Sequence, residues 1–347
     1  ISGNARVILR ACRERGIEPY AVIKGYNALP EINATLVESG FGCLASSRLH
    51  HLRRVKADHP GTRTLALRIP MRSEVADLVR WADCSLCSEI GTIEAIDAEA
   101  GKQGRPHGVI LMRDLGDLRE GVWGAERFVE TAIAVEKKFR RVRLYGIGAN
   151  LSCYGTVKPG TANMADLANC AAEIERGIGR RLDVVSGGAS TSLPMLVRGE
   201  MPRAVNNLRI GAGLMHRGDI YGVRDGELTD VTDDTMFLEG EIVEIGEKPT
   251  HPVGELDVDC FGNTRVFEDR GIRRRAILAF GAFDVGDVTK LTPLDPDTHI
   301  LGSSSDHTIV DIHDSGERYR LGGTMRFRME YQSMLYATAN ESVEKIF

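Results

Sequence analysis

The sequence predicts an α/β protein, with an N-terminal (β/α)₈ barrel over residues 1–227 and a smaller, mostly β domain over residues 228–347. In the first two-thirds, eight short apolar runs alternate with helix-like stretches. This alternation is typical of parallel strands joined by right-handed crossovers. After Leu228 the helical period gives way to short β-rich runs separated by Gly, Pro and Asp. An open doubly wound sheet has the same local pattern and stays the alternative to a closed barrel.

Length and composition narrow the class of protein. A chain of 347 residues is long enough for two domains, and its 42% hydrophobic and 27% charged residues are ordinary for a globular protein. The net charge of −5 argues against a general binder of nucleic acid or anionic membranes. No apolar run approaches the roughly 18 residues of a membrane span, and no signal-peptide pattern opens the chain. We therefore expect a cytoplasmic protein with no membrane partner; because the chain begins at Ile1, we also expect residues to precede it.

Each predicted element of the barrel follows from its local pattern. The eight predicted strands are Tyr20–Lys24, Gly42–Ala45, Thr64–Ile69, Cys84–Cys87, Gly108–Arg113, Leu144–Ala149, Leu182–Val185 and Asn207–Ile210. The predicted helices are Pro30–Ser39, Arg48–Lys56, Arg72–Trp81, Glu89–Ala100, Ala125–Lys138, Met164–Gly177 and Thr191–Arg198. In the second domain the predicted strands are Glu241–Ile245, Arg265–Glu268, Ala276–Phe280, Ile309–Ile312 and Arg326–Met329.

The first predicted strand delivers a lysine to its C-terminal end. Tyr20–Ile23 is apolar, Lys24 closes the run, and the turn residues Gly25, Asn27 and Pro30 follow. On this stretch alone, the favoured interpretation is a lysine that extends its amine to solvent. The alternative is an amine that forms a Schiff base in a dry pocket with cationic neighbours.

Two loops of small residues follow the seventh and eighth predicted strands. Ser186–Ser192 contains Gly187, Gly188 and the pair Ser190-Thr191, and Arg209–Gly213 contains two glycines. Free backbone N–H groups and hydroxyls at a helix N-terminus bind phosphate, and barrels place such a site after these two strands. Each loop alone is compatible with simple turn chemistry, whereas the two together predict a phosphate site.

The motif Cys84-Ser-Leu-Cys87 is a CxxC without a second copy, so a zinc ribbon is not expected. We interpret the two cysteines as small residues of a buried strand rather than as a redox pair. Seven scattered cysteines also fit a reducing compartment better than a disulfide framework. No metal site is predicted.

Four strand-end segments resemble the signatures of alanine-racemase-like (fold type III) pyridoxal-phosphate enzymes, and most closely those of the ornithine and broad-specificity amino-acid racemases. These segments are Asp114–Gly121, Asn150–Gly155, Ser186–Ser190 and Asn207–Gly211. The resemblance covers nearly the whole chain. It implies an N-terminal barrel, a C-terminal β domain, pyridoxal 5′-phosphate as cofactor, a small amino-acid substrate such as ornithine, lysine or alanine, and a head-to-tail homodimer.

The resemblance also implies roles for single residues. Lys24 would form the aldimine with the cofactor and exchange the Cα proton on one face of the substrate. Arg209 would face the pyridine nitrogen, Arg119 would lie near the cofactor's phenolic oxygen and the substrate carboxylate, and Asn150 would occupy the ring-stacking position. The phosphate would be bound by a set of residues from the last two loops: Ser190, Thr191, Gly211 and Ala212.

One part of the family pattern is missing. Alanine racemases supply a second base from a Gly-Tyr-Ala-Asp-Gly stretch of the partner subunit, and the matching stretch here, Phe280–Asp284, has no Tyr. Racemisation needs a proton donor on the face opposite Lys24. Asp306 and His307 are the first candidates; a surface or packing role for His307 is equally open. Cys153 is another candidate, for which a buried packing role is favoured.

The tyrosine that binds phosphate near the C-terminus is also missing, and Tyr26 or Tyr154 could replace it. Three alternatives to a racemase stay open: a cofactor-binding homeostasis protein, a lyase or decarboxylase of the same fold, and a cofactor-free Schiff-base aldolase. The second domain argues against the homeostasis protein, because its relatives are single domains.

Overall fold

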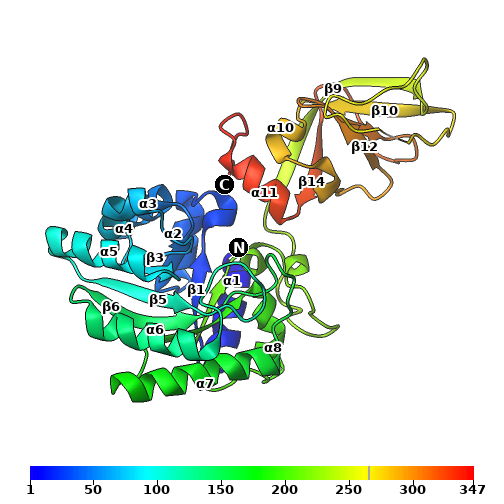
Figure 1. Cartoon of the computed structure of the whole chain (residues 1–347). Coiled ribbons are helices and arrows are strands. Elements are labelled where there is room, and N and C mark those ends of the chain that lie inside the picture. Colours follow the sequence, from blue (N-terminus) through cyan, green and yellow to red (C-terminus); the bar gives the residue numbers. More distant parts are fainter. Residues whose placement is uncertain (265) are drawn as a thin grey trace. The chain divides into compact units, whose positions relative to one another are not determined.

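The computed structural model describes residues 1–264 and 266–347 and divides the chain into two compact units, Ile1–Thr232 and Asp233–Phe347 (Figure 1). In the first unit, eight parallel strands close into a barrel in the order β1 to β8, each paired with its neighbour in sequence and β8 with β1. The strands are β1 (Glu18–Val22), β2 (Cys43–Ser46), β3 (Arg63–Ala66), β4 (Cys84–Cys87), β5 (His107–Met112), β6 (Val142–Gly148), β7 (Val184–Ala189) and β8 (Asn207–Ile210). The predicted closed barrel is confirmed, and the open sheet is excluded.

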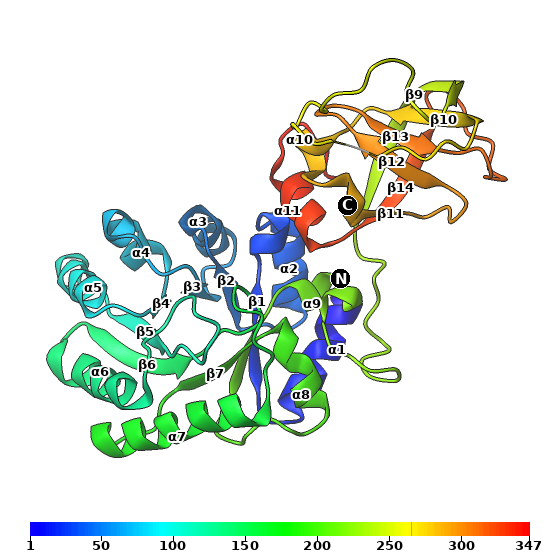
Figure 2. The same ribbon diagram turned by 45° about the vertical axis from the view of Figure 1, so that its right-hand side comes forward.

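Helices cover the outside of the barrel (Figure 2). They are α1 (Ser2–Arg13), α2 (Pro30–Glu38), α3 (Leu49–Asp58), α4 (Val75–Trp81), α5 (Ile90–Gln103), α6 (Ala125–Lys138), α7 (Thr161–Ile178), α8 (Leu193–Val197) and α9 (Ala212–Met215). Short 3₁₀ turns are η1 (Lys24–Tyr26), η2 (Arg72–Glu74), η3 (Ser190–Ser192) and η4 (Arg217–Asp219). The seven predicted helices are confirmed, with shifts of a few residues at their ends. No described helix combines the length and apolar character that crossing a bilayer requires.

Three details of the first unit differ from expectation. The predicted loop Ser186–Ser192 begins later, because β7 runs to Ala189 and includes Gly187 and Gly188. Helix α1 was not predicted, although its buried residues Ala5, Ile8, Leu9 and Cys12 have helical spacing. Lys24 was predicted as the last residue of the first strand, but β1 ends at Val22 and Lys24 begins η1. The strand stops there because the backbone N–H of Asn27 turns back to the carbonyl of Lys24 at 3.3 Å.

The second unit is a six-stranded antiparallel sheet in the order β11-β14-β9-β10-β13-β12. Its elements are β9 (Phe237–Pro249), β10 (Ile272–Leu278), α10 (Ala282–Val285), η5 (Val288–Lys290), β11 (Leu291–Pro293), β12 (His299–Ser303), β13 (Thr308–Asp311), β14 (Thr324–Met329) and α11 (Tyr331–Ala339). Four of the five predicted strands match β9, β10, β13 and β14. The fifth, Arg265–Glu268, is wrong for residues 266–268, which form no strand, and Arg265 lies outside the described residues.

Apolar side chains of alternate strand positions fill the barrel interior. This core cluster consists of Tyr20, Val22, Cys43, Ala45, Leu65, Cys84, Leu86, Ile110, Met112 and Val184. Because all eight strands run in one direction, the loops that carry the predicted site meet at one end of this core. The same topology leaves a second, opposite end, formed by the N-terminal ends of the strands.

Candidate active site

Lys24 lies at the C-terminal end of the barrel, directly after β1. Its side chain is exposed, yet desolvation by the surrounding protein lowers the pKa of its ammonium group, and the nearby cations Arg119 and Arg48 lower it further. Cys153 and Glu120 act in the opposite direction. A lysine with a lowered pKa has more of the neutral amine, which is the form that attacks carbonyl groups and accepts protons.

The turn behind Lys24 has an unusual backbone. Asn27 and Ala28 both have left-handed conformations, with φ of 52° and 49°. The guanidinium of Arg54, on α3, donates to the carbonyl oxygens of both, at 3.2 and 3.0 Å. These bonds stabilise a turn that non-glycine residues rarely adopt.

His51, also on α3, supports the same turn. Its Nε2 lies 2.8 Å from Oδ1 of Asn27, and its Nδ1 lies 2.9 Å from Oγ of Ser46. Since an amide oxygen only accepts, Nε2 carries the proton and Nδ1 accepts from the Ser46 hydroxyl. Burial, with help from His50 and Arg54, lowers the pKa of His51 to about 4, so the imidazole is neutral at pH 7.

Arg209, on β8, is buried with 3% of its surface exposed. Its Nη2 donates to the carbonyl of Ala149 at 2.7 Å, and its Nη1 donates to the hydroxyl of Ser186. Burial lowers the pKa of the guanidinium to about 10, although Glu120 and Cys153 favour the charged form. Arg209 and Lys24 thus share three electrostatic neighbours: Arg119, Glu120 and Cys153.

Asp117 joins the loops after β5 and β6. Its carboxylate accepts the backbone N–H groups of Cys153, Tyr154 and Val157 at 3.2, 2.9 and 3.1 Å. Burial raises the pKa of Asp117, but these hydrogen bonds outweigh burial and hold the pKa below its usual value. The loop that carries Arg119 is therefore fixed to the loop that carries Cys153.

The same two loops correct one prediction. Cys153 was expected as a buried packing residue, but its side chain is exposed, and it is a neighbour of Lys24. Arg119, half exposed, forms an ion pair with Glu120 whose Nη2–Oε1 distance is 2.7 Å.

The loops after β7 and β8 meet at one hydroxyl. Oγ of Ser190 accepts the backbone N–H groups of Gly211 and Gly213, at 3.2 and 3.1 Å. A Cβ at Gly213 would come within 3.3 Å of that hydroxyl and 2.9 Å of Ile220. Ala212 opens the short helix α9. The close approach of the two loops therefore depends on glycine.

Several buried polar atoms at this end have no hydrogen-bond partner in the described chain, among them the hydroxyl of Tyr26, Nδ2 of Asn150 and Oγ1 of Thr191. These three follow β1, β6 and β7 respectively. A buried polar atom without a partner costs about 1–3 kcal/mol, so such atoms mark a place where a ligand supplies the partner. Tyr154, by contrast, is 71% exposed.

Asp306 and His307 belong to the second unit. They lie in the exposed turn between β12 and β13. The carbonyls of Ser304 and Ser305 accept the backbone N–H groups of Ala282 and Phe283 at 3.0 and 2.9 Å. The turn that carries His307 is thus joined to the Phe280–Asp284 stretch, in which the family's tyrosine is missing.

Both thiols of the CxxC motif are buried in β4. Burial raises the pKa of Cys84 and brings that of Cys87 to about 12, although the Ser85 hydroxyl opposes the latter. The interpretation of two packing residues is confirmed. In the residues described, no three His, Cys, Asp or Glu side chains gather closely enough to hold a metal ion.

Sequence reasoning missed the residues that support the site. Asp117 lies in the segment Asp114–Gly121. A carboxylate in a loop that contains Gly is a signal that could have identified it. His51 and Arg54 gave no such signal, because they are ordinary positions of an amphipathic helix.

Comparisons with known proteins give the chain's relatives. Residues 1–216 match the family model described as alanine racemase, N-terminal domain. An ornithine racemase of Acetoanaerobium sticklandii is 39% identical over 343 residues, which cover 99% of this chain and 95% of that protein. A lysine racemase of Thermotoga maritima is 35% identical over 347 residues, which cover 100% of this chain and 96% of that protein.

Solved structures share the fold at low sequence identity. An alanine racemase of Clostridium difficile 630 superposes with a TM-score of 0.71 at 16% identity, covering 96% of this chain and 91% of that one. A D-threonine aldolase of Filomicrobium marinum gives a TM-score of 0.71 at 15% identity, covering 97% and 86%. The shared fold therefore includes proteins of more than one named activity.

Proposed function

Because this chain belongs to the alanine racemase family, we propose that it is a pyridoxal-phosphate-dependent amino-acid racemase. The names of the two curated relatives, ornithine racemase and lysine racemase, support a substrate with a cationic side chain. Ornithine and lysine are thus the first substrates to test, and alanine is the small apolar comparison. We also propose a cytoplasmic, head-to-tail homodimer, with residues 1–227 as the cofactor-binding domain and 228–347 as the β domain.

One structural observation carries the proposal. The Lys24 amine, with its lowered pKa, lies at the barrel end that also holds the unpartnered buried atoms of Tyr26, Asn150 and Thr191. An aldehyde cofactor with a phosphate needs an amine to bond and donors to hold its oxygens. The residues present fit these needs.

The phosphate would be held by the loops after β7 and β8. Ser190, Thr191 and the backbone of Gly211 and Ala212 would be its donors, and the unpartnered hydroxyl of Thr191 has a free proton to donate. Tyr26 would supply a further hydroxyl in place of the missing C-terminal Tyr. Asn150 would stack against the ring, and Arg209 would donate to the ring nitrogen.

Bound pyridoxal phosphate supplies the electron sink that makes the substrate Cα–H acidic. Lys24 Nζ takes or gives the Cα proton on one face. Arg119 holds the substrate carboxylate with its planar fork. Even with its pKa lowered to about 10, Arg209 remains protonated at pH 7. It therefore neither takes a proton from the ring nitrogen nor gives one to it.

The second proton donor is proposed to be His307 or Asp306 of the partner subunit. Their turn is exposed, which leaves the imidazole and carboxylate free to enter another subunit's site. Cys153 is the second candidate, because its exposed thiol neighbours Lys24 within the same unit.

Two experiments test the proposal. The visible absorption of the purified protein should show a band that borohydride abolishes in the wild type and that Lys24→Ala lacks; no such band would refute a pyridoxal-phosphate function. Incubation in deuterated water with L- and D-ornithine, lysine and alanine should give Cα exchange. A cofactor band without exchange on any amino acid would instead indicate a cofactor carrier.

The same exchange assay separates the candidates for the second base. Loss of that base should slow exchange from one enantiomer far more than from the other, because Lys24 still serves one face. We expect this asymmetry for His307→Ala or Asp306→Ala rather than for Cys153→Ala. Symmetric, wild-type exchange in the first two variants, with asymmetry in Cys153→Ala, would assign the role to the thiol.

A further inference from the structure

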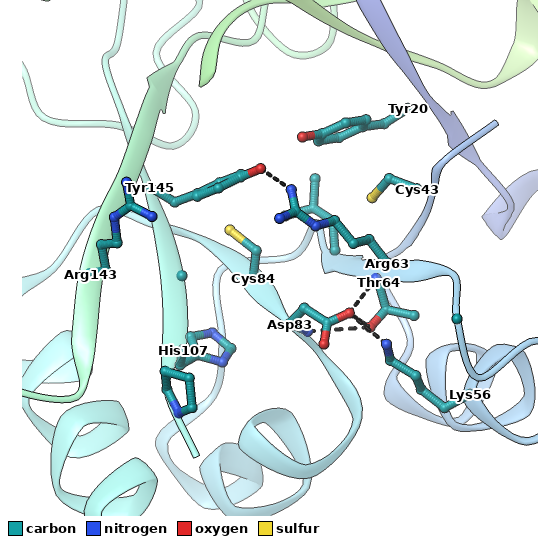
Figure 3. Close-up of a pocket in the computed structure, with 14 residues that line it drawn as sticks. Tyr20, Cys43, Lys56, Arg63, Thr64, Asp83, Cys84, His107, Arg143 and Tyr145 are labelled. Carbon is teal, nitrogen blue, oxygen red and sulfur yellow. Dashed lines mark hydrogen bonds and ion pairs between the residues drawn. The ribbon is translucent and has the colours of Figure 1, made fainter. Parts of the chain in front are cut away.

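A cavity lies at the opposite end of the barrel from Lys24. Its volume is about 400 Å³, which falls within the range of small-molecule pockets. It is lined at the N-terminal ends of β3 to β6 by Arg63, Cys84, Gly108 and Tyr145, with Tyr20 and other side chains further inside (Figure 3). None of these residues belongs to the site proposed above.

Small residues explain why the barrel leaves this space. Barrel interiors are normally filled by layers of Val, Ile and Leu. Here the lining includes Cys43 on β2 and the pair Cys84 and Gly108, which lie side by side on β4 and β5. A Cβ at Gly108 would come within 3.2 Å of both Cys84 Sγ and Tyr145 Cβ, so this position cannot hold a side chain that would fill the space. The inner wall, built from Tyr20, Leu65 and the thiols, is therefore apolar but incompletely packed.

The cationic side chains at the mouth of the cavity differ in whether they have a carboxylate partner. Lys56 forms an ion pair with Asp83 at 2.6 Å, and that carboxylate also accepts from Thr64. Arg143 forms an ion pair with Asp183 at 2.7 Å.

Arg63 differs from both. Among the residues that the structure describes, no carboxylate lies within ion-pair distance of it. Its guanidinium donates to the hydroxyl of Tyr145 and lies over that ring, 5.2 Å from the centroid. Figure 3 shows Arg63 reaching between Tyr145 and the thiols of Cys43 and Cys84.

We propose that this cavity binds a small monocarboxylate with a compact, flat apolar body. The guanidinium of Arg63 would bind the carboxylate through two N–H donors, and the Tyr145 hydroxyl, which now accepts from Arg63, would turn to donate to it. The apolar body would rest against Tyr20, Leu65 and the buried thiols.

A single unpaired cation favours one negative charge over a phosphate dianion. A small inorganic ion would leave the apolar inner wall without contacts, so the ligand should also carry an apolar part. The site thus differs from the catalytic end in its location. It also differs in having no lysine that could form a Schiff base. The ammonium of Lys56 donates hydrogen bonds to Asp83 and to the carbonyl of Thr62, the latter at 2.9 Å.

The test uses 4-fluorobenzoate as the probe and its ¹⁹F signal as the readout, on the full-length protein loaded with its cofactor. Saturable binding is expected, and the neutral 4-fluorobenzamide should bind at least about tenfold more weakly. Arg63→Met should weaken 4-fluorobenzoate binding by about 10- to 100-fold, because it removes a charge-assisted bidentate contact. Arg181→Met is the matched control: that side chain is 92% exposed, does not line the cavity, and its loss should leave binding unchanged.

Two further variants locate the probe. Arg119→Met, at the other end of the barrel, should retain 4-fluorobenzoate binding, whereas Cys84→Leu should abolish it by filling the cavity. Loss in Arg119→Met with retention in Arg63→Met would place the probe in the catalytic end and overturn the proposal. Absence of saturable binding, or equal affinity for the acid and the amide, would overturn it even if Arg63→Met failed to fold.

Discussion

The two ends of the barrel differ in how many of their polar side chains have partners within the protein. At the N-terminal end, two of the three cations named at the cavity mouth are paired, Lys56 with Asp83 and Arg143 with Asp183, and Arg63 is the exception. At the C-terminal end, the buried hydroxyls of Tyr26 and Thr191 have no protein partner.

This contrast distinguishes groups that stabilise the fold from groups that await a ligand. A buried hydrogen bond within the protein contributes to the free energy of unfolding, and its loss is felt with or without cofactor. An unpartnered buried group lowers the free energy of unfolding until a ligand supplies its partner. Substitutions at the two ends should therefore change different measured quantities.

The largest effect is expected from Lys24→Ala. Removing the amine should lower kcat by at least about 10³-fold, since general acid–base catalysis alone contributes 10²- to 10⁴-fold. The melting temperature should stay close to that of the wild type, because no protein hydrogen bond of the Lys24 amine is lost in the described structure. Racemase assays and thermal melting check this; a large loss of stability with retained activity would contradict the contrast.

Thr191→Val and Thr64→Val form a matched pair across the two ends. Thr191→Val should weaken cofactor binding by about 10- to 100-fold, because a hydrogen bond to a charged group contributes about 1.5–3 kcal/mol, while leaving the apoprotein at least as stable as the wild type. Thr64 Oγ1 donates to Trp81 O at 2.9 Å and also contacts Asp83. Thr64→Val should cost about 1–3 kcal/mol of stability and leave cofactor affinity unchanged.

Asp117→Asn and Asp83→Asn compare one buried or partly buried carboxylate at each end of the barrel. An amide has one acceptor oxygen instead of two, so each variant should lower the free energy of unfolding by about 1–3 kcal/mol. Only Asp117→Asn should also lower kcat, by several-fold, because Asp117 fixes the loops of Arg119 and Cys153. Equal kcat losses in the two variants would show that the carboxylates are not functionally distinct.

The smallest effect on activity is expected from acid titration of two buried histidines, one at each end. Burial lowers the pKa of both His51 and His107 to about 4, while the unfolded value is 6.5. The unfolded state therefore binds protons first, so stability is fully present above about pH 6.5 and is lost as pH falls toward 4. Denaturant titrations across this range should flatten for His51→Gln and for His107→Gln, and only the former should change kcat.

The fold was readable from the sequence because barrel strands are short, buried on both faces and separated by helices. Strands such as Cys84–Cys87 and helices such as Ala125–Lys138 match the prediction at both ends. Helix α1 was overlooked despite its spacing. In the second unit, β11 and β12 are short and contain Pro or Gly, which weakens their local strand pattern. The partner of β11, β14, is also remote in sequence.

The site was readable only in part. Positions after strand ends were predictable, because topology brings them together. The exposure of Cys153 and the support of Lys24 by His51 depend on contacts between residues far apart along the chain, and no local pattern encodes them. The cavity around Arg63 could not be predicted for the same reason. Cys43, Cys84 and Gly108 show no local pattern, and only the closed barrel places them around one space.

The left-handed turn of Asn27 and Ala28 bears on how such a protein responds to selection. A left-handed conformation costs a non-glycine residue about 1–2 kcal/mol, so Ala28→Gly should relieve strain and raise the melting temperature. Selection for thermal stability alone would then favour Ala28→Gly. The more flexible turn would position the Lys24 amine less precisely. Stability engineering of this barrel is therefore safest at positions remote from residues 24–28.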